Sequence, residues 1–84
     1  MAKKNVKKIF INNDFVLYVQ FGDGAVRSVD LRVWIDGPSK IKIDIEFCKM
    51  AFIEHGCIIS WPNGVSIDPG IIYDDGHIVE RFVE

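Results

Sequence analysis

Isoleucine and valine make up most of the apolar residues in this chain: thirteen isoleucines and nine valines stand against two leucines and three alanines. β-branched side chains lose rotamer freedom in a helix and pack well on a pleated sheet. The composition therefore predicts a mostly β protein with at most one or two short helices. With 84 residues, the chain is expected to form one domain over residues 1–84, with a small core.

The first half of the sequence is typical of a three-stranded antiparallel meander, in which apolar runs alternate with turn-forming residues. The expected strands are residues 6–11, 15–21 and 25–31. Asn12-Asn13-Asp14 separates the first two strands, and Gly22-Asp23-Gly24 separates the second from the third. Residues 32–37 are expected to continue the third strand outward until Pro38 ends it.

The pairing of the second hairpin depends on the length of its turn. A two-residue turn at Asp23-Gly24 would place Asp30 opposite Leu17 and bury a carboxylate on the core face. A three-residue turn, with Gly24 in the left-handed region, places Val29 opposite Leu17 instead. We expect the second register because it keeps apolar residues opposite apolar residues.

A short helix is expected in the middle of the chain. Asp44 is placed to cap a helix over residues 45–50, with Glu46 in its first turn and Phe47 as an anchor to the core. A strand is the alternative interpretation, because alternate residues in this region are apolar. These residues are Ile41, Ile43 and Ile45.

The second half is expected to form another β unit. Residues 51–54 and 57–61 flank His55-Gly56, which is typical of a two-residue hairpin turn. Two further turns are predicted, at Pro62-Asn63-Gly64 and at Asp68-Pro69-Gly70. The tail holds one more candidate strand over residues 77–83, or a helical turn that does not extend. The predicted fold class is therefore α+β: a small antiparallel β-meander followed by one short helix and a second β-hairpin unit.

No catalytic motif is recognisable in the sequence, and we predict neither an enzyme nor a bound cofactor. Cys48, His55 and Cys57 come nearest to a metal site, but zinc sites use four ligands and usually a close pair of cysteines. Two buried cysteines and a turn histidine are the expected arrangement, so no metal is predicted. Acidic residues at turn positions favour structural roles over acid–base chemistry. These residues are Asp68, Asp74 and Asp75.

The cysteine content and the apolar runs predict a cytoplasmic protein. Two cysteines are too few for the disulfide framework of small secreted domains. The basic start of the chain is not followed by the apolar run of a secretory signal. No segment is apolar over the length that crosses a bilayer, so no membrane association is expected.

Charge is distributed unevenly, although the net charge is only −2. Four lysines lie within the first eight residues, and acidic residues predominate from Asp68 onward. Lysines on an edge strand prevent edge-to-edge pairing, which is their expected role. The alternative is a phosphate-contacting patch, but without net positive charge nucleic-acid binding by this chain alone is not expected. The four lysines are Lys3, Lys4, Lys7 and Lys8.

A distinctive series of short motifs occurs along the chain. The motifs are Phe21-x-Asp23-Gly24, Val29-Asp30-Leu31, Glu46-Phe47, Trp61-Pro62-Asn63-Gly64 and Asp68-Pro69, ending near Tyr73. Together they resemble the small bacterial domain-of-unknown-function family numbered twenty-four forty-two, over about residues 6–73. The resemblance implies a small α+β fold and a cytoplasmic protein, often encoded beside another small protein in arrangements that resemble toxin–antitoxin pairs. It implies no activity, cofactor or catalytic residue.

The chain departs from the family pattern at three places. Ser66 stands where an acidic residue is usual, and Gly70 stands where glutamate is usual. Residues 74–84 form a C-terminal extension past the family-like core. The helix-turn-helix domain that some family members carry does not fit into this extension, so direct reading of DNA is not expected.

The leading functional prediction is a non-catalytic protein-interaction module. The partner would be another small protein, such as the product of a neighbouring gene, and the chain would be its antitoxin-like or regulatory partner. Alternatively, the partner would be a second copy of the chain in a homodimer. Tryptophan and tyrosine on rigid elements concentrate binding energy, although Trp61 is equally suited to a core position. The alternative function is weak nucleic-acid or nucleotide binding through the Lys-rich N-terminal strand. The candidate partner-binding residues are Trp61, Asn63, Asp68, Tyr73 and Phe47.

Overall fold

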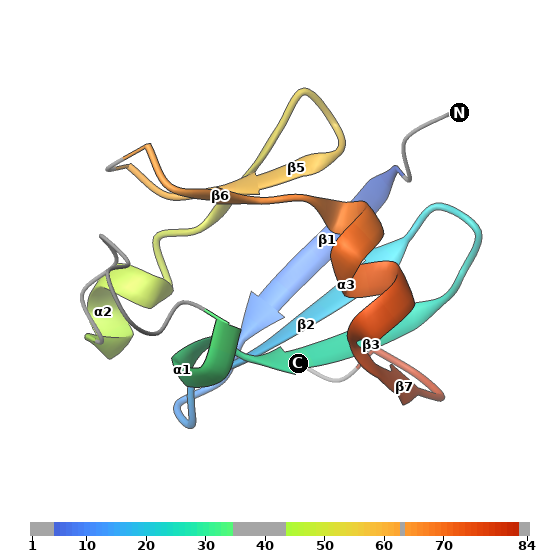
Figure 1. The fold of residues 1–84 in the computed structure, drawn as a ribbon, viewed down its shortest axis with the longest axis horizontal. Helices are drawn as coiled ribbons and strands as arrows, with labels where there is room; N and C mark the ends of the chain where they lie inside the picture. The colour runs from blue at the N-terminus through green and yellow to red at the C-terminus, as the bar shows by residue number, and fades with distance from the viewer. Residues whose placement is uncertain (1–4, 35–43, 63, 83–84) are drawn as a thin grey trace.

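The fold is α+β and mostly antiparallel, which confirms the predicted class (Figure 1). The computed structural model describes residues 5–34, 44–62 and 64–82. The strands within these residues are β1 (Val6–Ile11), β2 (Val16–Phe21), β3 (Val26–Asp30), β4 (Phe52–Glu54), β5 (Ile58–Ser60), β6 (Ser66–Ile67) and β7 (His77–Val79). The helices are α1 (Leu31–Trp34), α2 (Ile45–Cys48) and α3 (Pro69–Asp75).

The strands form two sheets that share one core. The meander β1–β2–β3 gains β7 at its far edge, giving the order β1-β2-β3-β7, while β4, β5 and β6 form the second sheet in chain order. Figure 1 shows α3 leading from β6 of the second sheet into β7 of the first. Side chains from both sheets and from α2 and α3 meet in the core. Its most buried members are Leu17, Val19, Phe21, Val29, Leu31, Cys48, Ile59, Trp61 and Ile72.

The predicted register of the β2–β3 hairpin is confirmed. Leu17 pairs with Val29, and the Leu31 amide donates to the Phe15 carbonyl over 2.9 Å. Gly24 has a φ of +92°, as the three-residue turn requires. The Asp23 carboxylate accepts from the Ala25 amide over 2.9 Å and holds the turn closed.

The predicted turn after Trp61 has the same hydrogen bonds as the β2–β3 turn. The Trp61 amide donates to the Val65 carbonyl over 2.9 Å, and the Gly64 amide donates to the Trp61 carbonyl over 3.0 Å. Gly64 has a φ of +90°. In both turns the first residue is a buried aromatic, Phe21 or Trp61, so each turn is anchored directly to the core.

The expected extension of the third strand past residue 31 is wrong for the residues that the structure describes, because Leu31–Trp34 forms α1. The cause is local. The Asp30 carboxylate accepts from the Arg32 amide over 2.9 Å, which turns the backbone out of the sheet. The Arg32 side chain also donates to Asp30, and these hydrogen bonds lower the pKa of the Asp30 carboxyl. Residues 35–37 and Pro38 lie outside the described residues.

The predicted helix after Asp44 is confirmed, and it ends at Cys48, two residues earlier than expected. The Asp44 carboxylate caps it by accepting from the Glu46 amide over 2.9 Å. The alternative strand interpretation is wrong for Ile45, which lies in the helix. Ile41 and Ile43 lie outside the described residues.

The β4–β5 hairpin is confirmed, but its turn is one residue longer than predicted. Glu54 pairs with Ile58, so three residues lie between the strands. His55 and Gly56 both have positive φ, +56° and +70°, and the Cys57 amide donates to the Glu54 carbonyl over 3.2 Å. Cys57 is therefore the extra residue, placed between the tight turn and β5.

The tail differs from the prediction at residues 68–75. The predicted turn at Asp68-Pro69-Gly70 is instead the start of α3, with Asp68 as the N-cap and Pro69 in the first turn. The predicted strand after it is confirmed as β7, which is limited to His77–Val79 and pairs with β3.

Candidate functional site

Trp61 lies in the core and not on the surface. Only 1% of its residue area is exposed, and its indole Nε1 donates to the Cys48 carbonyl over 3.0 Å. This hydrogen bond joins the end of β5 to the end of α2. Phe47, on α2, is half-buried and packs against the same core. Of the two roles expected for Trp61, a core position or a partner-binding position, the structure shows the core position. Its ring is therefore not available to a partner.

Tyr73 fixes α3 to the β2–β3 hairpin. Its hydroxyl donates to the Asp23 carboxylate over 2.9 Å, and its ring packs edge-on against Phe21 with centroids 5.0 Å apart. The Arg27 guanidinium lies 4.6 Å from the ring centroid, and Arg27 Nε donates to the Tyr73 carbonyl over 3.0 Å. These contacts join residues about fifty positions apart in the sequence, so Tyr73 has a structural role.

Asp68 is exposed and its carboxylate accepts from the Gly70 amide over 2.7 Å. It also borders a shallow hollow of about 190 Å³ on the second sheet, lined by Ile58, Ser66 and Pro69 as well. Asn63 lies outside the described residues. The predicted partner-binding residues thus serve three different structural tasks where the structure describes them, and they do not form one surface.

Removing the Asp68 cap is expected to destabilise the protein by about 1 kcal/mol, because the Gly70 amide loses its acceptor. Urea denaturation of Asp68→Ala followed by circular dichroism measures this change. Asp68→Asn is the control and should retain most of the stability, since an asparagine side chain also caps helices. Equal losses in both variants would contradict a capping role.

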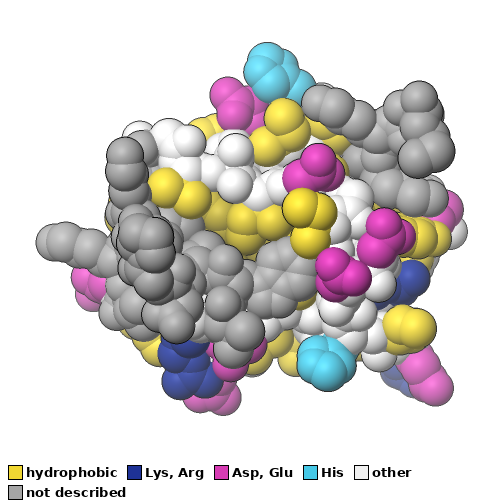
Figure 2. All heavy atoms as spheres, in the orientation of Figure 1, with side chains coloured by type: hydrophobic (Ala, Val, Ile, Leu, Met, Phe, Trp, Pro, Cys, Tyr) yellow, Lys and Arg dark blue, Asp and Glu magenta, His cyan; other side chains and the backbone are white. Residues whose placement is uncertain are grey.

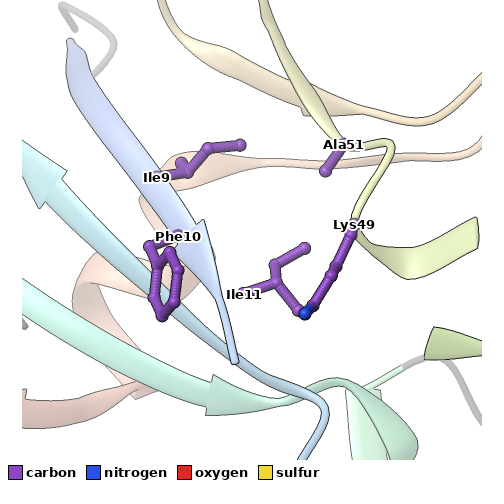
Figure 3. Close-up of a pocket in the computed structure, with 5 residues that line it drawn as sticks. All are labelled: Ile9, Phe10, Ile11, Lys49 and Ala51. Carbon is purple, nitrogen blue, oxygen red and sulfur yellow. The ribbon is translucent and has the colours of Figure 1, made fainter. Parts of the chain in front are cut away.

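A more promising site lies along the outer edge of β1, which is an edge strand of the sheet that the structure describes. A groove of about 260 Å³ separates this edge from the segment that joins α2 to β4 (Figure 3). Figure 3 shows the side chains of Ile9 and Ile11 directed from β1 toward Lys49 and Ala51, whereas Phe10 points to the other side of the strand. Met50 and Phe52, on either side of Ala51, are 54% and 44% exposed. The groove and its border are therefore largely apolar.

The backbone of β1 faces this groove with hydrogen-bonding groups. The Asn12 amide donates to the Val16 carbonyl over 3.0 Å, so in this antiparallel ladder Phe10 also bonds to β2. The amides and carbonyls of Ile9 and Ile11 therefore point away from β2, toward the groove. Only at its start does the outer edge find a partner among the described residues, where the Val6 amide donates to the Gly56 carbonyl over 3.0 Å.

Positive charge flanks the groove. Lys49 lines it, and its ammonium group donates to the Asn13 side chain near one end of β1. Lys7 is exposed on β1 near the other end. The acidic side chains of α3 gather elsewhere, on the face seen in Figure 2. The lysines of this strand can be recognised in the sequence, but the groove cannot, because its two sides are about forty residues apart.

The two thiols differ in their surroundings. Burial raises the pKa of the Cys48 thiol, whereas Cys57 is only half-buried beside the β4–β5 turn. A raised pKa means that Cys48 stabilises the fold as the neutral thiol. This contribution is complete below the unfolded-state pKa and is lost as the pH rises through the folded-state pKa.

Ellman's reagent is therefore expected to react with Cys57 in the native protein and with Cys48 only after unfolding. The reaction at pH 8, with and without denaturant, gives the number of thiols in each class. Cys57→Ser should leave no fast-reacting thiol. Two thiols that react at the same rate in the native protein would contradict the burial of Cys48.

In the part of the chain that the structure describes, His, Cys, Asp and Glu side chains do not gather in groups of three or more that could hold a metal ion. None of the described helices has the length and apolarity to cross a membrane. No protein-family model matches the chain, and neither a curated protein nor a solved structure is detectably similar to it. The family resemblance of the motifs around Trp61 stays a prediction.

Proposed function

We propose that this chain is a non-catalytic interaction domain that binds another small protein at the groove beside β1. The observation that supports this proposal most is the backbone edge at Ile9 and Ile11, which has no partner among the described residues and lies along an apolar groove. Exposed strand edges are templates for pairing with another chain. Met50 and Phe52 add exposed apolar area next to the same edge.

The partner we propose is the product of a neighbouring gene in a bacterium, with this chain acting as its antitoxin-like or regulatory partner in the cytoplasm. A homodimer through β1 is less favoured, because both copies would bring Lys7 and Lys49 to one interface. Nucleic-acid binding is the less favoured function, because the Lys8 ammonium lies over the Phe82 ring, 4.7 Å from its centroid. Lys3 and Lys4 lie outside the described residues.

The test is a calorimetric titration of the neighbouring gene's product into the wild-type chain and three variants. Met50→Asp changes a residue that borders the groove, and Ala51→Arg changes a residue that lines it opposite β1. Each variant is expected to weaken binding by at least about tenfold, equivalent to about 1.4 kcal/mol. Ile71→Asp is the matched control, because Ile71 is 50% exposed on α3, away from the groove. It should bind like the wild type.

Circular dichroism establishes that each variant is folded, and Met50→Asp keeps the test valid if Ala51→Arg unfolds. A partner that fails to bind the wild-type chain would overturn the proposal, and so would equal binding to all four folded proteins. Sedimentation of the isolated chain separates the dimer alternative, for which a species of twice 9.6 kDa is expected.

A further inference from the structure

We infer that the occupant of the groove is an extended acidic segment of the partner, which adds to β1 as a fifth strand of the four-stranded sheet. This inference rests on the proposed function and names the chemistry of the partner. It is carried by three features of the groove: the direction of the β1 backbone groups, the apolar side chains beside them, and the charges at the two ends.

The backbone defines the geometry of the occupant. Ile9 and Ile11 are two positions apart, and both direct an amide and a carbonyl toward the groove. This is the spacing at which one strand hydrogen-bonds to another. A segment in extended conformation can pair with all four groups at once, whereas a helix satisfies its own backbone groups and has none to offer.

The side walls define the pattern of the occupant's side chains. Ile9 and Ile11 line the groove on the β1 side and Ala51 lines it on the other, whereas Phe10 points to the opposite side of β1. Side chains of an added strand alternate between the same two sides. Apolar residues at every second position would therefore pack against Ala51 and the isoleucines.

The charges define the remaining side chains. Lys49 is exposed and lines the groove, and Lys7 is an exposed residue of β1, two positions before Ile9. Carboxylates at the intervening positions of the occupant would lie near these ammonium groups, whereas a basic segment would be repelled. The same lysines disfavour a second copy of β1, which brings its own lysines to the interface.

The probe is a blocked eight-residue peptide in which valine and glutamate alternate, added to the isotopically labelled full chain and followed by NMR. We expect saturable shifts along β1, and amide exchange slowed by at least about tenfold at Ile9 and Ile11. Exchange at Phe10 should change little, because its amide already bonds to β2. The matched peptide with lysine in place of glutamate should not bind.

Charge reversal in the protein tests the electrostatic part. Lys7→Glu and Lys49→Glu are each expected to weaken binding of the acidic peptide by at least about tenfold. Lys7→Arg and Lys49→Arg are the matched controls, because they keep the positive charge at the same sites and should bind the acidic peptide like the wild type. Two further peptides test strand pairing, and each is N-methylated on every second amide, in one peptide at the valines and in the other at the glutamates. Only the peptide whose unmethylated amides face β1 should bind, because methylation removes the hydrogen-bond donor.

The outcomes separate this inference from the proposed function. Strand addition would be overturned if the acidic and basic peptides bind equally, or if both N-methylated peptides bind equally. It would also be overturned if the acidic peptide binds without slowing amide exchange at Ile9 and Ile11. If the acidic peptide does not bind, but the partner protein binds and Met50→Asp weakens the binding of the partner protein, strand addition is wrong and the proposed function stands. If neither the peptide nor the partner protein binds, both are wrong.

Discussion

Trp61→Ala is expected to lower the free energy of unfolding by about 3–5 kcal/mol, because it removes the largest side chain that is buried among the described residues. A domain of 84 residues has a total stability of roughly 4–13 kcal/mol, so much of it would be lost. The loss includes the hydrogen bond from the indole to the Cys48 carbonyl, which ties α2 to the second sheet. Urea denaturation followed by far-ultraviolet circular dichroism measures the change.

Trp61→Phe separates the ring from its hydrogen bond. Phenylalanine retains most of the apolar contact but removes the indole donor to the Cys48 carbonyl, which keeps the hydrogen bond from the Ala51 amide over 3.3 Å. The expected cost is therefore that of one hydrogen bond, about 0.5–1.5 kcal/mol. The expected order of stability is therefore wild type, Trp61→Phe and Trp61→Ala. A change below about 1 kcal/mol in Trp61→Ala would contradict the core position of this residue.

Tyr73→Ala is expected to destabilise the protein by about 2–4 kcal/mol. The change removes the edge-on contact with Phe21 and the contact with the Arg27 guanidinium, which together fix α3 to the hairpin. Tyr73→Phe is the control. It removes only the exposed hydrogen bond to Asp23 and should cost about 0.5–1 kcal/mol. Thermal unfolding of the two variants gives the comparison, and equal losses would show that the ring contacts contribute nothing.

The sequence was sufficient to predict the elements that depend on neighbouring residues. The β2–β3 register follows from the alternation of apolar residues and from Gly24, and α2 follows from the cap at Asp44. Helix α3 could not be predicted from its own residues, because Asp68-Pro69-Gly70 at its start is equally typical of a turn. The helix is also held by contacts of Tyr73 with the β2–β3 hairpin, about fifty residues earlier in the chain. Helix α1 depends on one side-chain cap at Asp30.

The candidate site was less predictable than the fold. Trp61 is suited both to a surface site and to the core, and sequence alone does not separate these positions for a large aromatic residue. The groove requires the order of the strands. Because β7 joins the sheet beside β3, the edge of β1 is left next to Lys49 and Ala51. The apolar run Ile9-Phe10-Ile11 in a lysine-bearing strand is the one signal that pointed there.

Amide hydrogen exchange along β1, measured in the free chain and in the complex with the neighbouring gene's product, is the most direct test of the proposed interface. In the free chain, Phe10 and Asn12 should exchange slowly and Ile9 and Ile11 rapidly. In the complex, Ile9 and Ile11 should become as slow as their neighbours. Unchanged exchange at both isoleucines in a saturated complex would contradict binding at this edge.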